Sequence, residues 1–241
     1  WKSWQFTTLQ GGQVEADEIE AAKSDLDERT FRQEYEATFE TYAGAIYYNF
    51  DREQNVKRLK TDETAIHIGM DFNIDPMSAA VFQLKNNIIN FIDEIVIYSS
   101  NTDELVKEIK TRYANRQIIV YPDPACKQRK TSAGGKTDLN ILQNAGLTVR
   151  VKNAHPQVRD RINAVNSRLK NTNDQRMMFI DPKCKNIIRG LERHLYKEGT
   201  TQPDKDSGFD HMNDAIGYAV DYLFPIRKQY TKQLPQRWSV K

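Results

Sequence analysis

Aspartates occur at three places where folding could bring their side chains together. Asp71 ends the alternating run IHIGMD, and Asp123 directly follows IIVYP, which is typical of a buried strand. Ligands of open α/β sheets gather at the carboxyl ends of strands. The third place is FDHMNDAIGYA, where Asp210 and Asp214 are four residues apart and share one helix face. If the strands of Asp71 and Asp123 are adjacent, their carboxylates face each other.

Each acid alone also has a structural explanation. Asp71 could end a strand, Asp123 could initiate a turn, and Asp210 could cap a helix. Three carboxylates on one sheet edge would instead repel and raise one another's pKa, an arrangement that makes sense chiefly as a site for hard divalent cations. Asp214 also lies beside an apolar helix face, where an unpaired carboxylate costs several kcal/mol.

The sequence GGKT at residues 134–137 matches only the end of a phosphate-binding loop. The complete motif needs a glycine at position 130, where this chain has Lys130. We therefore interpret the segment as a flexible basic loop and expect no nucleotide site there.

Composition and charge bound the remaining possibilities. The net charge of the 241 residues is only +2, so attraction to nucleic acid must come from local clusters of basic residues. No apolar run approaches the roughly 20 residues that span a bilayer, and the chain lacks a signal peptide at its start, so we expect a soluble intracellular protein. Cys126 and Cys184 suit ordinary thiols in a reducing compartment. Because the sequence begins at Trp1 without Met, we expect a fragment of a longer chain.

The elements that must position the acids follow from periodicity. Runs 66–72, 77–84 and 88–98 predict three consecutive antiparallel strands joined by hairpins. Helices and strands then alternate: helix 102–114, capped by Asn101 or Thr102, strand 117–123, helix 138–146 closed by Gly146, strand 147–152, helix 156–171, strand 176–181, and helices 185–196 and 209–224. This order predicts an α/β mixed sheet, with three antiparallel strands before the parallel ones, flanked by helices.

The first third of the chain follows a different pattern. Residues 14–40 predict two short helices with an apolar stripe of Phe31, Tyr35 and Phe39. The pattern is then lost over residues 40–62, which we interpret as a connector with exposed charge. We therefore predict three parts: a helical segment 1–61, an α/β domain 62–225 and a basic tail 226–241.

With GMDFN, YPDPA and FDHMNDAIGYA in this order, the chain resembles the nuclease domain of the large terminase subunit of tailed bacteriophages, a ribonuclease H-like nuclease. The resemblance covers roughly residues 62–225, and its most specific element is DHxxDAxxY, from Asp210 to Tyr218. It implies that Asp71, Asp123 and Asp214 hold two Mg²⁺ or Mn²⁺ ions, with Asp210 as a further candidate ligand. His211 would lie beside the ligands, and Glu94 is a further acid that could aim toward them.

The resemblance also implies an activity and partners. The chain would be a metal-dependent endonuclease that cuts concatemeric viral DNA in the host cytoplasm, with little sequence preference. Its partners would be double-stranded DNA, an ATPase domain preceding it in the full-length chain, the portal protein and the small terminase subunit. Phosphate contacts are expected from Lys127, Arg129, Lys130, Lys136, Arg159 and Arg161. For the two arginines on the helix, a solvated face is an equal alternative.

Two other functions stay open at this point. The same fold could serve as a junction resolvase, transposase or ribonuclease H, although the resemblance of the first 61 residues to a terminase linker argues against these. The acids could also be vestigial in a catalytically silent docking module of a packaging motor.

Overall fold

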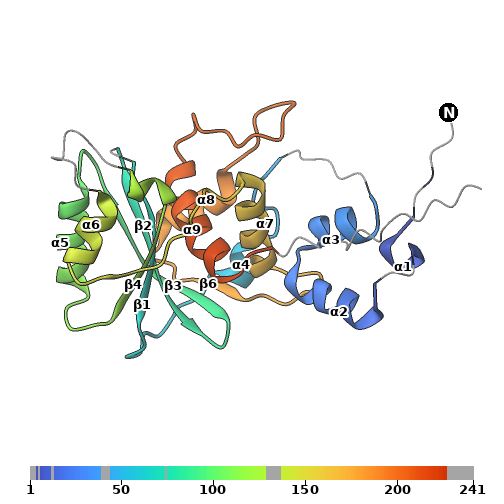
Figure 1. The fold of residues 1–241 in the computed structure, drawn as a ribbon, viewed down its shortest axis with the longest axis horizontal. Coiled ribbons are helices and arrows are strands. Elements are labelled where there is room, and N and C mark those ends of the chain that lie inside the picture. Colours follow the sequence, from blue (N-terminus) through green and yellow to red (C-terminus); the bar gives the residue numbers. More distant parts are fainter. Residues whose placement is uncertain are drawn as a thin grey trace, which may run out of the picture.

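A six-stranded mixed sheet forms the centre of the structure, a computed structural model of the chain (Figure 1). The structure describes residues 4, 6–11, 14–38, 44–73, 75–128 and 137–226. The predictions for Arg129, Lys130, Lys136 and the tail from residue 227 fall outside these residues.

The strand order β5-β4-β1-β2-β3-β6 combines a meander with parallel strands. The bounds are β1 Ile66–Asp71, β2 Met77–Lys85, β3 Ile88–Ile97, β4 Ile118–Pro122, β5 Thr148–Val149 and β6 Met178–Ile180. Strands β1, β2 and β3 are antiparallel, whereas β4 pairs parallel with β1, β5 with β4 and β6 with β3. Asn86 and Asn87, with φ of 51° and 62°, form the turn of the β2–β3 hairpin. The predicted mixed sheet is therefore confirmed.

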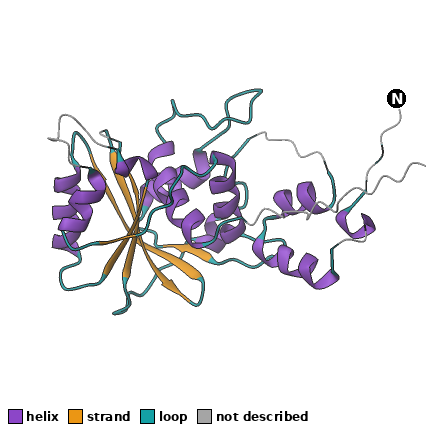
Figure 2. Ribbon diagram, viewed as in Figure 1, coloured by secondary structure: helices purple, strands orange, loops and turns teal. Residues whose placement is uncertain are grey.

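Alternation along β1 separates two helical layers (Figure 2). Ile66, Ile68 and Met70 pack in a core with α5 (Thr102–Arg112) and α6 (Asp138–Asn144). The other face of the sheet packs against α7 (Val158–Leu169), α8 (Lys185–Arg193) and α9 (Asp210–Leu223). Because side chains alternate, Gly69 and Asp71 belong to this second face. Within the described residues, no helix is both long and apolar enough to cross a bilayer.

The helix ends largely follow the sequence signals. The side chain of Asn101 accepts a hydrogen bond from the backbone N–H of Glu104 and caps α5, and Gly146 adopts φ 82° just after α6. Both cysteines are buried free thiols, as expected.

The first three helices lie at one end of the molecule (Figure 1), where residues of the second and third form a small separate core. They are α1 (Thr8–Gly11), α2 (Ala16–Asp25) and α3 (Glu28–Tyr35). The Phe31 and Tyr35 rings stack with centroids 5.0 Å apart, while Phe39 lies outside the described residues.

Residues 40–62 carry exposed charge, as expected, at positions 51–53, but their middle part also packs into the core. Ile46 and Tyr47 are buried in the core of the second face. After them, α4 (Arg52–Asn55) ends in Asn55, whose side-chain amide donates to the backbone carbonyl oxygens of Leu169 and Met178. The residues that pack are few and irregularly spaced, which is why no periodicity marked them.

Candidate metal-binding site

The carboxyl ends of β1 and β4 bring Asp71 and Asp123 to one edge of the sheet. Met70 pairs with Pro122 in the parallel ladder, and the backbone N–H of Asp123 donates to the carbonyl oxygen of Met70 at 3.1 Å. The adjacency on which the sequence argument depended is therefore confirmed. The Asp123 carboxylate also accepts from the backbone N–H of Ala125, so it initiates the turn into the 3₁₀ helix η1 (Pro124–Lys127) as well.

Helix α9 reaches this edge because β1 has no side chain at Gly69. A Cβ built on Gly69 would lie 2.1 Å from the carbonyl oxygen of Ala215, so the backbones of α9 and β1 are in direct contact. The first turns of α9 thus lie opposite the end of β1, with His211 and Asp214 near Asp71. Gly69 is a sequence signal for this contact that was missed, since a glycine inside a strand often marks a close approach of another backbone.

Asp71 is paired with a histidine from α9. His211 Nδ1 lies 3.1 Å from Asp71 Oδ2, and Asn73 Nδ2 lies 2.8 Å from His211 Nε2. A neutral ring that donates from Nδ1 and accepts from Asn73 satisfies both contacts. The hydrogen bond with Asp71 raises the pKa of His211. Burial raises the pKa of Asp71, with further contributions from Asp214 and Asp123 that the His211 hydrogen bond partly offsets.

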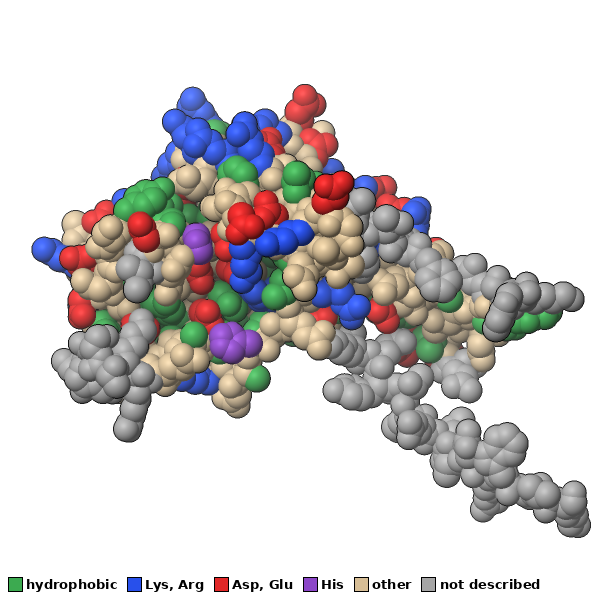
Figure 3. Space-filling view, turned by 90° about the horizontal axis from the view of Figure 1, so that it is seen from above, with side chains coloured by type: hydrophobic (Ala, Val, Ile, Leu, Met, Phe, Trp, Pro, Cys, Tyr) green, Lys and Arg blue, Asp and Glu red, His purple; other side chains and the backbone are tan. Residues whose placement is uncertain are grey.

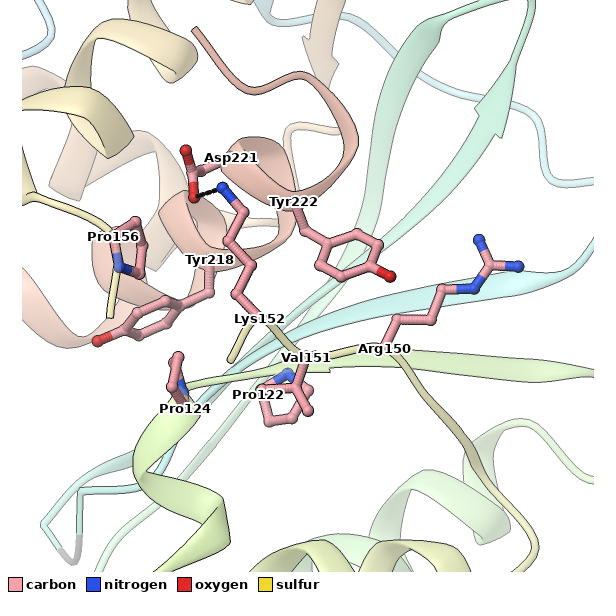
Figure 4. Close-up of a pocket in the computed structure, with 9 residues that line it drawn as sticks. All are labelled: Pro122, Pro124, Arg150, Val151, Lys152, Pro156, Tyr218, Asp221 and Tyr222. Carbon is pink, nitrogen blue, oxygen red and sulfur yellow. Dashed lines mark hydrogen bonds and ion pairs between the residues drawn. The ribbon is translucent and has the colours of Figure 1, made fainter. Parts of the chain in front are cut away.

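Asp123 is paired with a histidine that the sequence analysis left aside. His155 Nδ1 lies 3.2 Å from Asp123 Oδ1, and the imidazole is 55% exposed. Its segment, residues 150–157, is held by Lys152, whose ammonium binds Asp221 of α9, as Figure 4 shows. Lys127 Nζ also donates to the carbonyl oxygen of Lys152 at 3.0 Å. These bonds hold the segment that carries His155 over the acidic edge.

Asp214 is paired with Arg161, and this corrects one prediction. Arg161 Nη1 donates to Asp214 Oδ1 at 2.8 Å, and its guanidinium carbon lies 4.3 Å from the centre of the Tyr218 ring. The Arg161 side chain is only 7% exposed. The prediction that Arg161 contacts a DNA phosphate is therefore wrong, because this side chain is buried against Asp214 and Tyr218. Burial lowers the pKa of Arg161, but Asp214, Tyr218 and Tyr47 together outweigh it, so the pKa is raised.

The pKa of Tyr218 on α9 is affected by all three carboxylates. Burial raises the pKa of its phenol, Arg161 lowers it, and the charges of Asp123, Asp214 and Asp71 raise it further. The charges of Asp71, Asp123 and Asp214 therefore all reach the same phenol, so the three carboxylates lie around one region. In Figure 3, acidic, basic and His side chains lie close together near the middle of the face.

The side chains fit a divalent cation in chemistry and location. Carboxylate oxygens are the ligands that Mg²⁺ and Mn²⁺ prefer. Asp210 Oδ1 is buried without a hydrogen-bond partner, and its closest ionic neighbour is His211 Nε2 at 3.7 Å. Within the described ranges, no three His, Cys, Asp or Glu side chains lie close enough to bind one ion together as they stand. Mg²⁺ commonly uses only one or two carboxylates, with waters and substrate phosphates completing its shell.

The remaining predicted residues have separate positions. Both Glu94 oxygens accept hydrogen bonds from the first turn of α8, from the backbone N–H groups of Asn186 and Ile187 at 2.9 Å each. Glu94 thus caps a helix, a role the sequence analysis did not foresee. Arg159 is exposed, with its Nε 4.0 Å from Asp160.

Comparison with known proteins finds a family whose matched region includes the three aspartates. A family model described as a terminase RNaseH-like domain matches residues 68–223, which include Asp71, Asp123 and Asp214. No curated protein matches the chain.

Several solved structures have a similar fold. The large terminase of a thermophilic bacteriophage, solved in complex with ATP-γ-S, is 19% identical with a TM-score of 0.68, and the match covers 90% of this chain and 55% of that one. The P22 large terminase nuclease domain is 13% identical with a TM-score of 0.57, over 76% and 95% of the two chains. The large terminase nuclease of thermophilic phage G20c with bound magnesium is 13% identical with a TM-score of 0.52, over 74% and 97%. This chain therefore spans about half the length of the ATP-γ-S-bound large terminase.

Proposed function

The chain belongs to the terminase ribonuclease H-like domain family, and from this premise we propose that it is a metal-dependent endonuclease that cuts concatemeric viral DNA during genome packaging. The observation that carries the proposal is the meeting of Asp71 and Asp123 on adjacent parallel strands. Asp214 joins them from α9 across the Gly69 contact. The solved G20c nuclease with bound magnesium supports the use of a divalent cation.

We assign Asp71, Asp123 and Asp214 as ligands of two Mg²⁺ or Mn²⁺ ions, with Asp210 as a further ligand. Bound there, the two ions would activate the attacking water and stabilise the leaving 3′ oxygen. Asp71, at the end of a central strand, would hold the ions together with Asp123 and the α9 acids.

The chain's own residues prepare these carboxylates. His211 orients Asp71 through Nδ1, and His155 covers Asp123 from the solvent side. Arg161 fixes one Asp214 oxygen and leaves the other for a ligand. The Arg161 guanidinium offsets part of the repulsion among the acids, and the His211 hydrogen bond stabilises the Asp71 carboxylate.

Substrate and partners follow from the family and remain part of the proposal. We propose double-stranded DNA as substrate and an ATPase domain in the same full-length chain, since the longer thermophilic-phage large terminase was solved with ATP-γ-S. The portal protein and the small terminase subunit would be assembly partners in the host cytoplasm.

Cleavage of supercoiled plasmid with Mn²⁺ tests the activity. The protein should nick and linearise the plasmid, and Asp71→Asn should abolish cutting while the circular dichroism spectrum stays unchanged. Asp103→Asn, at an exposed acid on α5, is the matched control and should cut normally. Retained cutting by Asp71→Asn would remove the site assignment.

A substrate panel separates the alternatives. Duplex DNA should be cut in preference to four-way junctions and RNA/DNA hybrids, whereas the reverse order would favour a resolvase or ribonuclease H. No cutting of plasmid by a large excess of protein with Mn²⁺ would favour a silent docking module.

A further inference from the structure

A row of basic side chains lies exposed along α8, outside the acidic site. Lys185, Arg189 and Arg193 follow one another at intervals of four residues, so they share one face of the helix and span about 12 Å of its axis. Lys183, just before the helix, is exposed as well. We call these four residues the α8 row. The opposite face of α8 packs in the core.

The α8 row forms no close ionic contact within the described residues, although the charge of Arg193 acts on the neighbouring Glu192. Within the part of the chain that the structure describes, none of its four side chains forms an ion pair or a hydrogen bond. In contrast, Arg52 forms a two-point contact with Glu192 on the same helix. A solvated helix face commonly alternates acids and bases at this spacing, whereas like charges four residues apart destabilise the helix. The row is therefore better suited to an external polyanion than to the stability of α8.

The start of α8 shows how the helix tolerates this charge. Lys185 is its first residue, where a cation opposes the helix dipole, and the cap residue Cys184 does not cap the helix, because its thiol donates to the carbonyl oxygen of Phe91 instead. Glu94 from β3 supplies the missing acceptor to Asn186 and Ile187. Stabilisation from outside the helix allows its exposed face to carry the basic row.

Helix α8, which carries the row on its exposed face, packs on its other side against α9, the helix of Asp210 and Asp214. A Cβ on Gly190 would lie 2.7 Å from Asn213 Oδ1, so α8 lies directly against α9. The segment after α8 then brings Lys205 to a cavity that Asp210 and Asp214 also line. Figure 3 shows Lys and Arg side chains gathered at one edge of the molecule, beyond the acidic residues near its centre.

We propose that the α8 row binds the phosphate backbone of duplex DNA and holds it beside the acidic site. Long basic side chains without fixed partners suit phosphate contacts, which position a duplex without reading its bases. An acidic protein partner would be expected to need apolar anchors, and no residue within α8 is both apolar and exposed. The identity of the polyanion rests on the proposed function, but binding does not require cleavage.

Charge reversal of the α8 row tests the proposal. The variant is Arg189→Glu/Arg193→Glu, and the matched control is Lys85→Glu/Lys107→Glu, which changes the net charge equally at exposed positions on β2 and α5. Binding of a short labelled duplex is measured by fluorescence anisotropy in EDTA over a series of salt concentrations. Arg189→Gln/Arg193→Gln serves as a second variant that keeps helix-forming side chains, in case glutamates at the end of α8 prevent folding.

The α8 variants should bind at least about tenfold more weakly, and the slope of log K against log salt should fall by about 0.9 for each phosphate that is no longer neutralised. The control should bind as the unmodified protein does. Equal weakening in variant and control, or unchanged binding by the α8 variants, would overturn the proposal. Unchanged DNA binding together with abolished binding to the terminase ATPase domain would assign the row to a protein partner instead. If DNA binding depends on the α8 row but the protein does not cut plasmid, the proposal for the row is supported and only the proposed nuclease activity is contradicted.

Discussion

Substitution of Gly69 by alanine tests the contact that brings α9 to the sheet edge. The new Cβ would lie 2.1 Å from the carbonyl oxygen of Ala215 and 2.9 Å from its carbonyl carbon. Ordinary contact begins near 3.4 Å, so α9 must move away from β1 by roughly 1 Å. Overpacking typically costs about 1–3 kcal/mol, and we expect the upper end because a helix backbone cannot rotate aside as a side chain can.

The same movement should act on the site. His211 and Asp214 lie on α9, so the 3.1 Å contact between His211 Nδ1 and Asp71 would lengthen with the helix. A misplacement of about 1 Å in a catalytic group can cost about 10²-fold in rate. Gly69→Ala should therefore lower both the free energy of unfolding and the rate of plasmid cutting.

Urea denaturation and a plasmid-nicking time course with Mn²⁺ measure the two effects. Gly217→Ala is the matched control because its Cβ meets only the Arg161 side chain, at 3.5 Å or more, and Gly217 lies on the same helix as Ala215. This control should keep its activity and gain about 0.5–1 kcal/mol, since alanine favours a helix interior over glycine. Equal stability and equal cutting by the two variants would refute the reasoning.

Three further predictions concern Arg161 and two residues outside the acidic site, His194 and Glu94. Arg161→Ala should destabilise the protein by about 3 kcal/mol in urea denaturation, the low end for breaking a buried ion pair, because Asp214 is 26% exposed. Arg161→Lys should restore only part of this stability; full restoration would exclude a role for the planar guanidinium. Burial lowers the pKa of His194 below its ordinary value of 6.5, so the stability it contributes is complete above that pH and is lost as the pH falls through the lower folded value. Urea midpoints should drop across this window, and His194→Gln should flatten the drop; an identical pH profile in that variant would contradict the assignment. Glu94→Gln should cost about 1 kcal/mol at the start of α8 and leave the cutting rate unchanged, whereas a large loss of cutting at normal stability would assign Glu94 to the site.

The sequence predicted the sheet because its signals are local. Each strand of the meander carries its own alternation, and the Asn86–Asn87 turn ties the register of β2 and β3 to the turn itself. The sequence predicted that Asp71 and Asp123 would face each other on condition that β1 and β4 were adjacent. The structure supplies that condition, because strand pairing between distant segments has no local signal.

The basic partners could not be predicted because they depend on tertiary contacts. His155 reaches Asp123 only because Lys152 is tied to Asp221 on a distant helix. Arg161 lies on a helix with basic residues on both faces, and periodicity does not say which of them is buried against α9. The alternative prediction, a solvated face of α7, is also wrong for Arg161, whose guanidinium is buried.

A small residue, in addition to the acids, determines the geometry of the proposed site. Aspartates at strand ends are common, and each one here also has an ordinary structural explanation. Asp214 is brought to this edge because α9 touches β1 at Gly69, where a Cβ would meet the Ala215 backbone and the Ala219 side chain. A sequence with all of the acids and a bulky residue at position 69 would keep the motif letters and lose the geometry. The decisive feature for recognising this site is therefore the glycine two residues before the strand-end aspartate, read together with the alanine after Asp214.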